Sequence, residues 1–205
     1  EVDLLTASNR HYYKKLTKFY LNANAIYTDL VEKRDFLKGF IKGNEVKLII
    51  AEAARTRTLL AEGAQGIWLD VENGSYPYVT SSNTGIGGAL NGMGVYVDFD
   101  YRIGIAKAYT TRVGEGPFPT ELNNHVGEEL RKNGGEFGAT TGRPRRCGWL
   151  DLEVLRTSIM ASGINYIAMT KIDVLSSLDP IPVCVAYDSS GQPIYEYQEG
   201  WNQDI

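Results

Sequence analysis

The chain has 205 residues, of which 43% are hydrophobic and 22% are charged, which is enough for one globular domain with a substantial core. Its formal net charge of −4 argues against a general affinity for nucleic acid or for anionic membrane surfaces. No apolar run approaches the roughly 20 residues of a membrane-spanning helix, and the segment Glu1–Leu5 has no basic region of the kind that opens a signal peptide.

The first 57 residues are predicted to be mostly helical. Between about residues 9 and 40, apolar side chains recur at spacings of three and four, which gives a helix one apolar face. These side chains are Tyr12, Leu16, Phe19, Tyr20 and Ala23. A second helix is expected from Glu45 to about Ala54.

Strand and helix patterns alternate after residue 57. Residues 58–62 are a short strand candidate, and residues 71–96 are expected to be a long ordered loop because they are rich in Gly, Ser, Thr and Asn. Residues 103–109 have the pattern of a buried strand, and Pro119 is predicted to open a helix that runs to about Arg131.

The last third of the chain continues the alternation. Asp151 is predicted to cap a helix over residues 152–161, and strands are expected at 165–169 and 182–187, followed by a turn at 188–191. These elements predict one α/β domain over residues 1–205, with a mainly parallel sheet flanked by helices.

The cysteines and histidines do not form a metal-binding pattern. Cys147 and Cys184 lie far apart, and His11 and His125 are isolated. We therefore expect no zinc site and two reduced thiols in a cytoplasmic protein.

Residues 138–146 form a basic cluster in an otherwise acidic chain. Arg143, Arg145 and Arg146 offer forked donors that suit carboxylate or phosphate groups. Gly142 allows the backbone to approach a ligand closely. The pattern predicts an anion-binding loop for a small phosphorylated or carboxylated substrate, with a solvated basic turn as the alternative.

Two earlier segments carry neutral hydrogen-bonding groups. Gln65 follows the predicted strand 58–62 and can both donate and accept hydrogen bonds, as recognition of a purine edge requires. Residues 76–84 carry several hydroxyl groups, including that of Thr80, which can cradle a phosphate. A polar strand-end turn and a loop that bonds its own backbone are the alternative explanations.

A fourth segment, Thr170–Asp173, follows an apolar strand. An aspartate here can accept hydrogen bonds from a guanine base while the stem of Lys171 lies along the base. Lys171 and Asp173 are equally compatible with ordinary charges at the end of a strand.

Taken in this order, these segments resemble the adenylosuccinate synthetase family. The resemblance is dense from about residue 58 to 188 and thin over the first 50 residues. The matching stretches are Glu62–Gly66, Gly74–Thr84, Lys107–Leu122, Glu136–Asp151 and Thr170–Leu175.

The resemblance implies a P-loop-NTPase-like synthetase fold and a ligase of purine (AMP) biosynthesis that forms a C–N bond. Such enzymes join L-aspartate to IMP and use GTP with Mg²⁺ to phosphorylate the purine 6-oxygen before aspartate displaces the phosphate. A homodimer is also implied, as are residues 58–205 as the substrate- and nucleotide-binding core.

The resemblance also implies roles for single residues. Gln65 would orient the purine and support catalysis, Thr80 would bind the IMP phosphate, and Arg143 would reach the same nucleotide. The L-aspartate site would consist of Val113, Ala139, Thr140, Thr141, Gly142, Arg143 and Arg145. The GTP site would consist of Arg145, Lys171, Ile172 and Asp173, and the resemblance implies no metal ligand in this chain.

The sequence departs from the family in several places. The family's Gly-rich phosphate loop and its assisting histidine have no match here, so we expect the central portion of a synthetase that is inactive alone. Pro144 stands where many members have a basic residue, and the segment Gly85–Gly94 also differs. Two alternatives therefore stay open: a phage-type 2-aminoadenylosuccinate synthetase that acts on dGMP, and a non-catalytic nucleotide-binding remnant.

Overall fold

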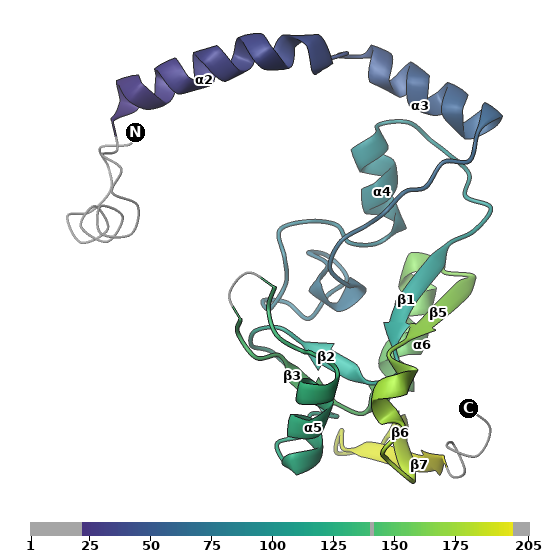
Figure 1. Cartoon of the computed structure of the whole chain (residues 1–205). Coiled ribbons are helices and arrows are strands. Elements are labelled where there is room, and N and C mark those ends of the chain that lie inside the picture. Colours follow the sequence, from purple (N-terminus) through teal and green to yellow (C-terminus); the bar gives the residue numbers. More distant parts are fainter. Residues whose placement is uncertain (1–21, 140–141, 199–205) are drawn as a thin grey trace. The chain divides into compact units, whose positions relative to one another are not determined.

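The computed structural model describes residues 22–139 and 142–198, which form two compact units divided between Ile50 and Ala51 (Figure 1). The helices are α2 (Ala23–Leu37), α3 (Glu45–Thr56), α4 (Ile86–Met93), α5 (His125–Asn133) and α6 (Leu152–Ser162), with short 3-10 helices at Lys38–Phe40, Ile67–Leu69 and Ile172–Leu175. The strands are β1 (Ile103–Lys107), β2 (Thr110–Arg112), β3 (Arg146–Gly148), β4 (Leu150–Asp151), β5 (Tyr166–Thr170), β6 (Ile181–Tyr187) and β7 (Pro193–Gln198).

The described part of the first unit, from Asn22 to Ile50, is mostly helical. Asn22 caps α2, because its side-chain oxygen accepts hydrogen bonds from the backbone N–H groups of Asn24 and Ala25 at 2.9 and 3.3 Å. The predicted apolar residues Tyr12 to Tyr20 lie outside the described residues, and Ala23 is exposed. The predicted second helix is confirmed as α3, within which the boundary between the units falls.

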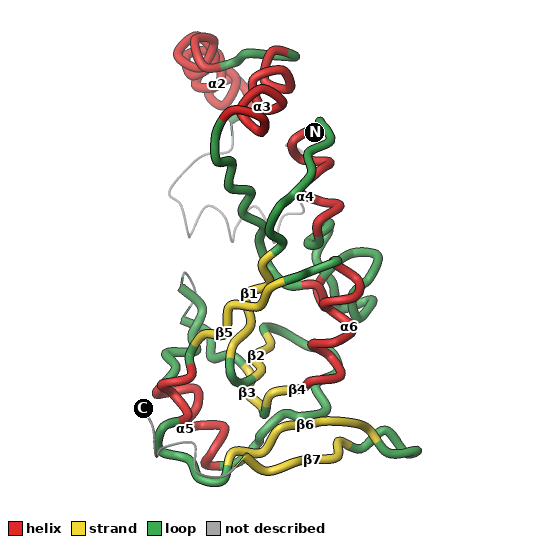
Figure 2. Tube along the Cα trace, turned by 90° about the vertical axis from the view of Figure 1, so that its right-hand side faces the viewer, coloured by secondary structure: helices red, strands yellow, loops and turns green. Residues whose placement is uncertain are grey.

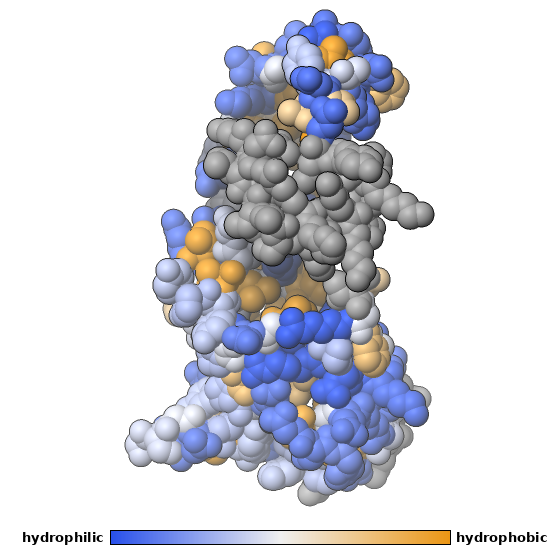
Figure 3. Space-filling view, turned by 90° about the vertical axis from the view of Figure 1, so that its left-hand side faces the viewer, coloured by the Kyte–Doolittle hydropathy of each residue, from blue (hydrophilic) through white to orange (hydrophobic). Residues whose placement is uncertain are grey.

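Hydrophobic side chains are exposed on both helices. Tyr27 and Phe36 on α2 are 70% and 72% exposed, and Leu48 on α3 is 73% exposed. The space-filling view shows such hydrophobic residues at the surface among hydrophilic ones (Figure 3).

Short sheets with parallel and antiparallel pairs lie in the second unit (Figure 2). β1 pairs with β5 in parallel, and β4 pairs with β6 in parallel. β2–β3 and β6–β7 are antiparallel pairs. The structure therefore has the predicted α/β class, but the sequence patterns did not predict β7 or the short strands β2 to β4.

The strand predicted at 103–109 is present, but it is not buried as predicted. Ile103 and Ile105 are 56% and 73% exposed. β1 pairs with β5 in a sheet of two strands, so much of the surface of these two side chains stays exposed. Burial begins only beyond the strand, at Ala108 and Tyr109.

Three other boundaries differ from the prediction. Residues 58–62 are exposed and irregular, with no strand beside them in the described chain, so the predicted strand is wrong. Part of the predicted loop 71–96 is α4, whose half-buried Ile86, Ala89, Leu90 and Met93 have helical spacing.

The helix predicted from Pro119 begins only at His125. The side-chain oxygen of Asn124 accepts from the N–H groups of Val126 and Gly127, so this residue is the cap of α5. Glu121 instead forms a β-bridge with Gly148. By contrast, α6 starts where predicted, because the Asp151 carboxylate accepts from the N–H of Val154 at 3.0 Å.

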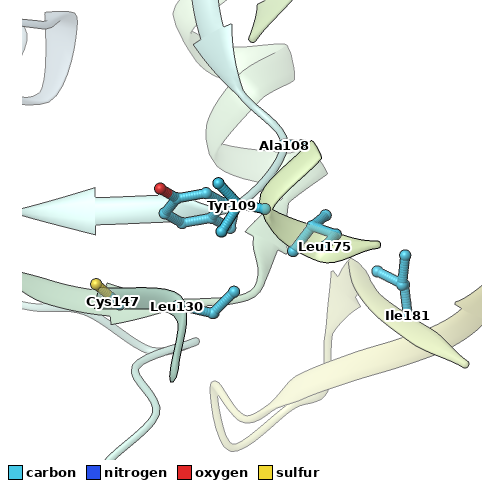
Figure 4. Close-up of a cluster of buried hydrophobic side chains, with 7 residues drawn as sticks. Ala108, Tyr109, Leu130, Cys147, Leu175 and Ile181 are labelled. Carbon is cyan, nitrogen blue, oxygen red and sulfur yellow. The ribbon is translucent and has the colours of Figure 1, made fainter. Parts of the chain in front are cut away.

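The core of the second unit forms where these elements meet (Figure 4). Its buried side chains are Ala108, Tyr109, Leu130, Cys147, Val174, Leu175 and Ile181. Both cysteines are free and buried, and burial raises the pKa of each thiol. Tyr109 and Cys147 belong to this core, and residues close to them in sequence belong to the candidate site. The core therefore anchors the backbone from which the site is built.

Candidate functional site

A buried carboxylate organises the loop of residues 70–84. One oxygen of Asp70 accepts from the N–H groups of Glu72 and Asn73 at 3.0 and 2.9 Å, and the other accepts from the N–H of Thr84 at 2.6 Å. The side chain of Asp70 is fully buried. These bonds, of which that from Asn73 contributes most, lower its pKa to about 2. The loop is therefore closed on an ionised group.

The same loop brings the turn of Gln65 close to that of Thr80. The N–H of Thr80 donates to the carbonyl of Leu69 at 2.7 Å, and the hydroxyl of Thr84 donates to the carbonyl of Gly66 at 3.0 Å. Gln65 is exposed and has a φ of 61°, which turns the chain immediately before these contacts. The two predicted IMP-binding segments thus lie side by side.

Arg112, at the end of β2, connects this loop to the rest of the unit. Its guanidinium donates to the hydroxyl of Ser75 at 2.8 Å and to the carbonyl of Tyr78 at 3.2 Å. Burial lowers its pKa, as does the nearby charge of Arg146. The next residue, Val113, is 58% exposed.

Arg146 was interpreted as a hydrogen-bond donor to a bound anion, but its guanidinium is used within the protein. Its guanidinium forms two hydrogen bonds with the carboxylate of Glu121, at 2.8 and 2.5 Å, and another with the carbonyl of Gly116 at 2.9 Å. It also lies over the ring of Phe118, 5.4 Å from the centroid. The hydrogen bond from Arg146 lowers the pKa of Glu121. Arg146 thus holds the segment 114–121 in place.

The predicted anion-binding loop closes on itself between Gly138 and Arg145. The N–H of Gly138 donates to the carbonyl of Arg143 at 2.9 Å, and the N–H of Gly142, whose φ is 64°, donates to the carbonyl of Gly138 at 2.8 Å. Ala139 and Arg143 are exposed. Thr140 and Thr141 lie outside the described residues.

A buried glutamate that the sequence did not single out lies under this loop. Glu136 is 1% exposed, and its carboxylate accepts from Lys107 at 2.6 Å, from the Tyr109 hydroxyl at 2.7 Å and from Arg145 at 2.8 Å. Burial alone would raise the pKa of Glu136, but these three hydrogen bonds lower it below its ordinary value. Burial also raises the pKa of Tyr109. In the sequence these residues are up to 38 positions apart, so no spacing pattern could join them.

The predicted guanine-binding segment contacts the same region. Lys171 has a φ of 63°, and its ammonium donates to the carbonyl of Gly134 at 2.9 Å. Ile172 packs against the core, while Asp173 is exposed. Lys171 therefore ties the end of β5 to the segment that precedes Glu136.

These contacts connect the segments that carry the described candidate residues within the second unit. The 65–84 loop reaches β2 through Arg112, and β2 pairs with β3 beside Arg145. Arg145 reaches Glu136, and Lys171 reaches Gly134. An apolar pocket elsewhere in the unit, between β5 and β6, includes Ile172 but no other predicted site residue.

The described residues contain neither a metal-binding cluster nor a membrane-spanning helix. No group of three or more His, Cys, Asp or Glu side chains there is arranged to hold a metal ion. Within the same ranges, no helix is long and apolar enough to cross a membrane.

The amino-acid sequence of the chain matches a known protein family. The family model described as adenylosuccinate synthetase matches residues 2–205, which is almost the whole chain. The chain belongs to the adenylosuccinate synthetase family. The predicted resemblance is thereby confirmed, and it extends into the N-terminal segment where the motifs are thin.

Individual members of the adenylosuccinate synthetase family agree. The chain is 54% identical over 164 residues to the adenylosuccinate synthetase of Salinibacter ruber, a match that covers 72% of this chain and 37% of that protein. It is 43% identical over 211 residues to the enzyme of Clostridium perfringens, a match that covers 95% of this chain and 49% of that protein. The chain therefore spans about half the length of such curated relatives.

A solved structure supports the fold. The fully ligated adenylosuccinate synthetase from Plasmodium falciparum superposes with a TM-score of 0.80 at 35% sequence identity, over 95% of this chain and 51% of that protein. This match confirms the predicted synthetase fold, of which the chain contains a part.

Proposed function

We propose that this chain carries the substrate-recognition part of an adenylosuccinate synthetase, a ligase that joins L-aspartate to IMP at the expense of GTP. The observation that carries the proposal is the hydrogen-bonded network of the second unit, which links the segments predicted to hold the three substrates. Membership of the family supports the choice of reaction.

The IMP site is assigned to the loop organised by Asp70. Thr80 binds the phosphate, and Gln65 orients the purine near its reacting oxygen. The ionised Asp70 draws the backbone N–H groups of residues 72, 73 and 84 toward itself, so the loop holds its shape without the ligand. Such pre-organisation reduces the ordering cost of binding the nucleotide.

The aspartate site is assigned to the 138–145 loop and to the backbone of Val113. Arg143 and Arg145 supply charge-assisted hydrogen bonds to the carboxylates, together with the backbone of Ala139, Thr140, Thr141 and Gly142. Arg143 also reaches IMP. Placing the amino group of aspartate beside the purine turns the ligation into a reaction between two positioned groups.

The GTP site is assigned to Arg145 and to the segment Lys171–Asp173. Asp173 accepts from the guanine base, and Lys171 and Ile172 line it. GTP use in this family comes with Mg²⁺, but the described residues contain no fitting ligand cluster, so no step on this chain is assigned to the ion. A cytoplasmic homodimer is proposed as the working assembly.

The proposal is tested with the purified full-length enzyme. Adenylosuccinate should form when IMP, L-aspartate, GTP and Mg²⁺ are all present, and formation should stop when any one of them is left out. Chromatography of the reaction mixture measures the product. An enzyme that binds these compounds but makes no product would instead support the non-catalytic remnant.

A further inference from the structure

Arg145 is held from one side by three contacts. Its Nη1 donates to the Glu136 carboxylate at 2.8 Å, and its backbone N–H donates to the Glu136 carbonyl at 3.0 Å. Its own carbonyl accepts from the Nε of Arg131 at 2.8 Å. The residue therefore has a fixed backbone and one fixed edge of its guanidinium.

The guanidinium is not fully satisfied by these contacts. Its Nε is buried and has no hydrogen-bond partner, and it is the one buried side-chain nitrogen or oxygen in this state within the described ranges. Buried donors are normally paired, and each exception calls for an explanation. An oxygen atom of a bound ligand would supply the missing acceptor.

Glu136 is itself held firmly from below. Lys107 and Tyr109 donate to one carboxylate oxygen, at 2.6 and 2.7 Å, which leaves the other oxygen for Arg145. The carboxylate is buried, while Lys107 and Arg145 are 27% and 32% exposed. The negative charge thus lies between two cations that would otherwise repel each other.

We propose that Glu136 is a positioning residue, which orients the guanidinium of Arg145 toward the carboxylate of the L-aspartate substrate. This inference rests on the proposed function. Lys107 and Tyr109 fix Glu136, Glu136 fixes Nη1, and the remaining N–H groups of Arg145 face the ligand in a preset direction. Less side-chain freedom is then lost when the substrate binds.

The substitution Glu136→Gln tests this role in the full-length enzyme. A glutamine amide presents a donor either to Arg145 or to Lys107, both of which are donors only, so the fixed geometry is lost. We expect the KM for L-aspartate to rise about tenfold, as for the loss of one charge-assisted hydrogen bond. The KM for IMP should rise less than the KM for L-aspartate, because Thr80 and Gln65 lie on a different loop.

A double-mutant cycle separates positioning from a general structural effect. In an Arg145→Leu background, Glu136→Gln should cause little further change in the KM for L-aspartate, because Glu136 acts through Arg145. Equal effects of Glu136→Gln in both backgrounds would overturn the inference. Glu129→Gln on α5, whose carboxylate accepts from the Ser177 hydroxyl, makes the same chemical change as a control.

Two further results keep the test decisive. If Glu136→Gln does not fold, Glu136→Asp keeps the charge and withdraws the carboxylate by one methylene, and its KM for L-aspartate should still rise. A wild-type KM in either folded variant refutes the role of Glu136 and leaves the proposed function intact. Absence of product from the wild-type enzyme refutes the proposed function and this inference together.

Discussion

Neighbouring arginines in the basic cluster have different roles, which their carboxylate partners decide. Arg146 forms two hydrogen bonds with Glu121 and also binds a backbone carbonyl, so its fork is used within the protein. Arg145 offers one edge to Glu136 and keeps an unpaired Nε. The sequence shows these arginines as equivalent, because their partners are distant in the chain.

Replacement of Arg143 by leucine should weaken the binding of both L-aspartate and IMP. Loss of a charge-assisted hydrogen bond costs about 1.5–3 kcal/mol, so each KM should rise roughly tenfold or more. Steady-state kinetics of the full-length enzyme measures both values. Arg156→Leu, at an exposed ion pair with Glu153 on α6, is the control. Unchanged saturation by both substrates in Arg143→Leu would show that the assignment is wrong.

Replacement of Asp70 by asparagine should loosen the 70–84 loop. The shift of its pKa from 3.8 to about 2 corresponds to about 2 kcal/mol of stabilisation by the ionised form. The backbone N–H groups of Asn73 and Thr84 should therefore exchange with solvent roughly 30-fold faster in the variant. Hydrogen-exchange measurement resolves these amides, and Asp188→Asn in the exposed β6–β7 turn is the matched control. Unaltered exchange at Asn73 and Thr84 would contradict the role of Asp70.

The same group predicts a dependence of stability on pH. Because the pKa of Asp70 is lower in the folded state than in the unfolded state, its contribution is complete above about pH 4. That contribution is lost as the pH falls toward about 2. The difference in exchange between the wild type and Asp70→Asn should shrink over this window, and a difference that is independent of pH would exclude ionisation as its cause.

Among the elements, the C-terminal end of α5 determines how closely the Tyr109 side chain can approach Glu136. Gly134 is the C-cap of this helix, and its carbonyl accepts from Lys171. A Cβ at this glycine would overlap the hydroxyl of Tyr109 and lie 2.7 Å from the carbonyl of Leu130. The absence of a side chain at Gly134 therefore allows Tyr109 to reach Glu136.

The substitution Gly134→Ala should destabilise the protein and disturb the Glu136 cluster. Overpacking of this kind costs about 1–3 kcal/mol, so the Tm of the full-length enzyme should fall by several degrees. Gly87→Ala in α4 is the control, since its Cβ meets no atom within 4 Å and alanine favours a helix. Equal Tm values for Gly134→Ala and the wild type would contradict the close approach.

Elements with local signals could be predicted from the sequence, and those that depend on distant partners could not. Asp151 marked the start of α6 because a cap acts within three residues. Pro119 gave a false helix start, because Glu121 pairs with Gly148, 27 positions away. The candidate residues Gln65, Thr80 and Lys171 came from motifs, whereas Glu136 and Asp70 act through burial that no motif records.

At the scale of the whole molecule, the chain is proposed to carry recognition groups, and it spans about half the length of its relatives. In the 205-residue chain, Ile103 and Ile105 are exposed, and so are hydrophobic side chains of α2 and α3. Substrate recognition and the complete reaction can therefore be tested separately.

The isolated 205-residue chain should form no adenylosuccinate. Its sequence has no match to the family's Gly-rich phosphate loop, so we expect it to lack the groups that transfer the phosphoryl group. Product formation by the purified chain at a rate above that of a heat-treated sample would refute this expectation. The full-length enzyme under identical conditions is the positive control.

Gln65, Thr80 and Arg143 are proposed to recognise IMP for its ligation to L-aspartate. The most direct test gives the full-length enzyme equimolar IMP and dGMP together with L-aspartate, GTP and Mg²⁺, and measures both products by mass. We predict that adenylosuccinate is the dominant product. A dominant product derived from dGMP, or no ligated product at all, would contradict the claim.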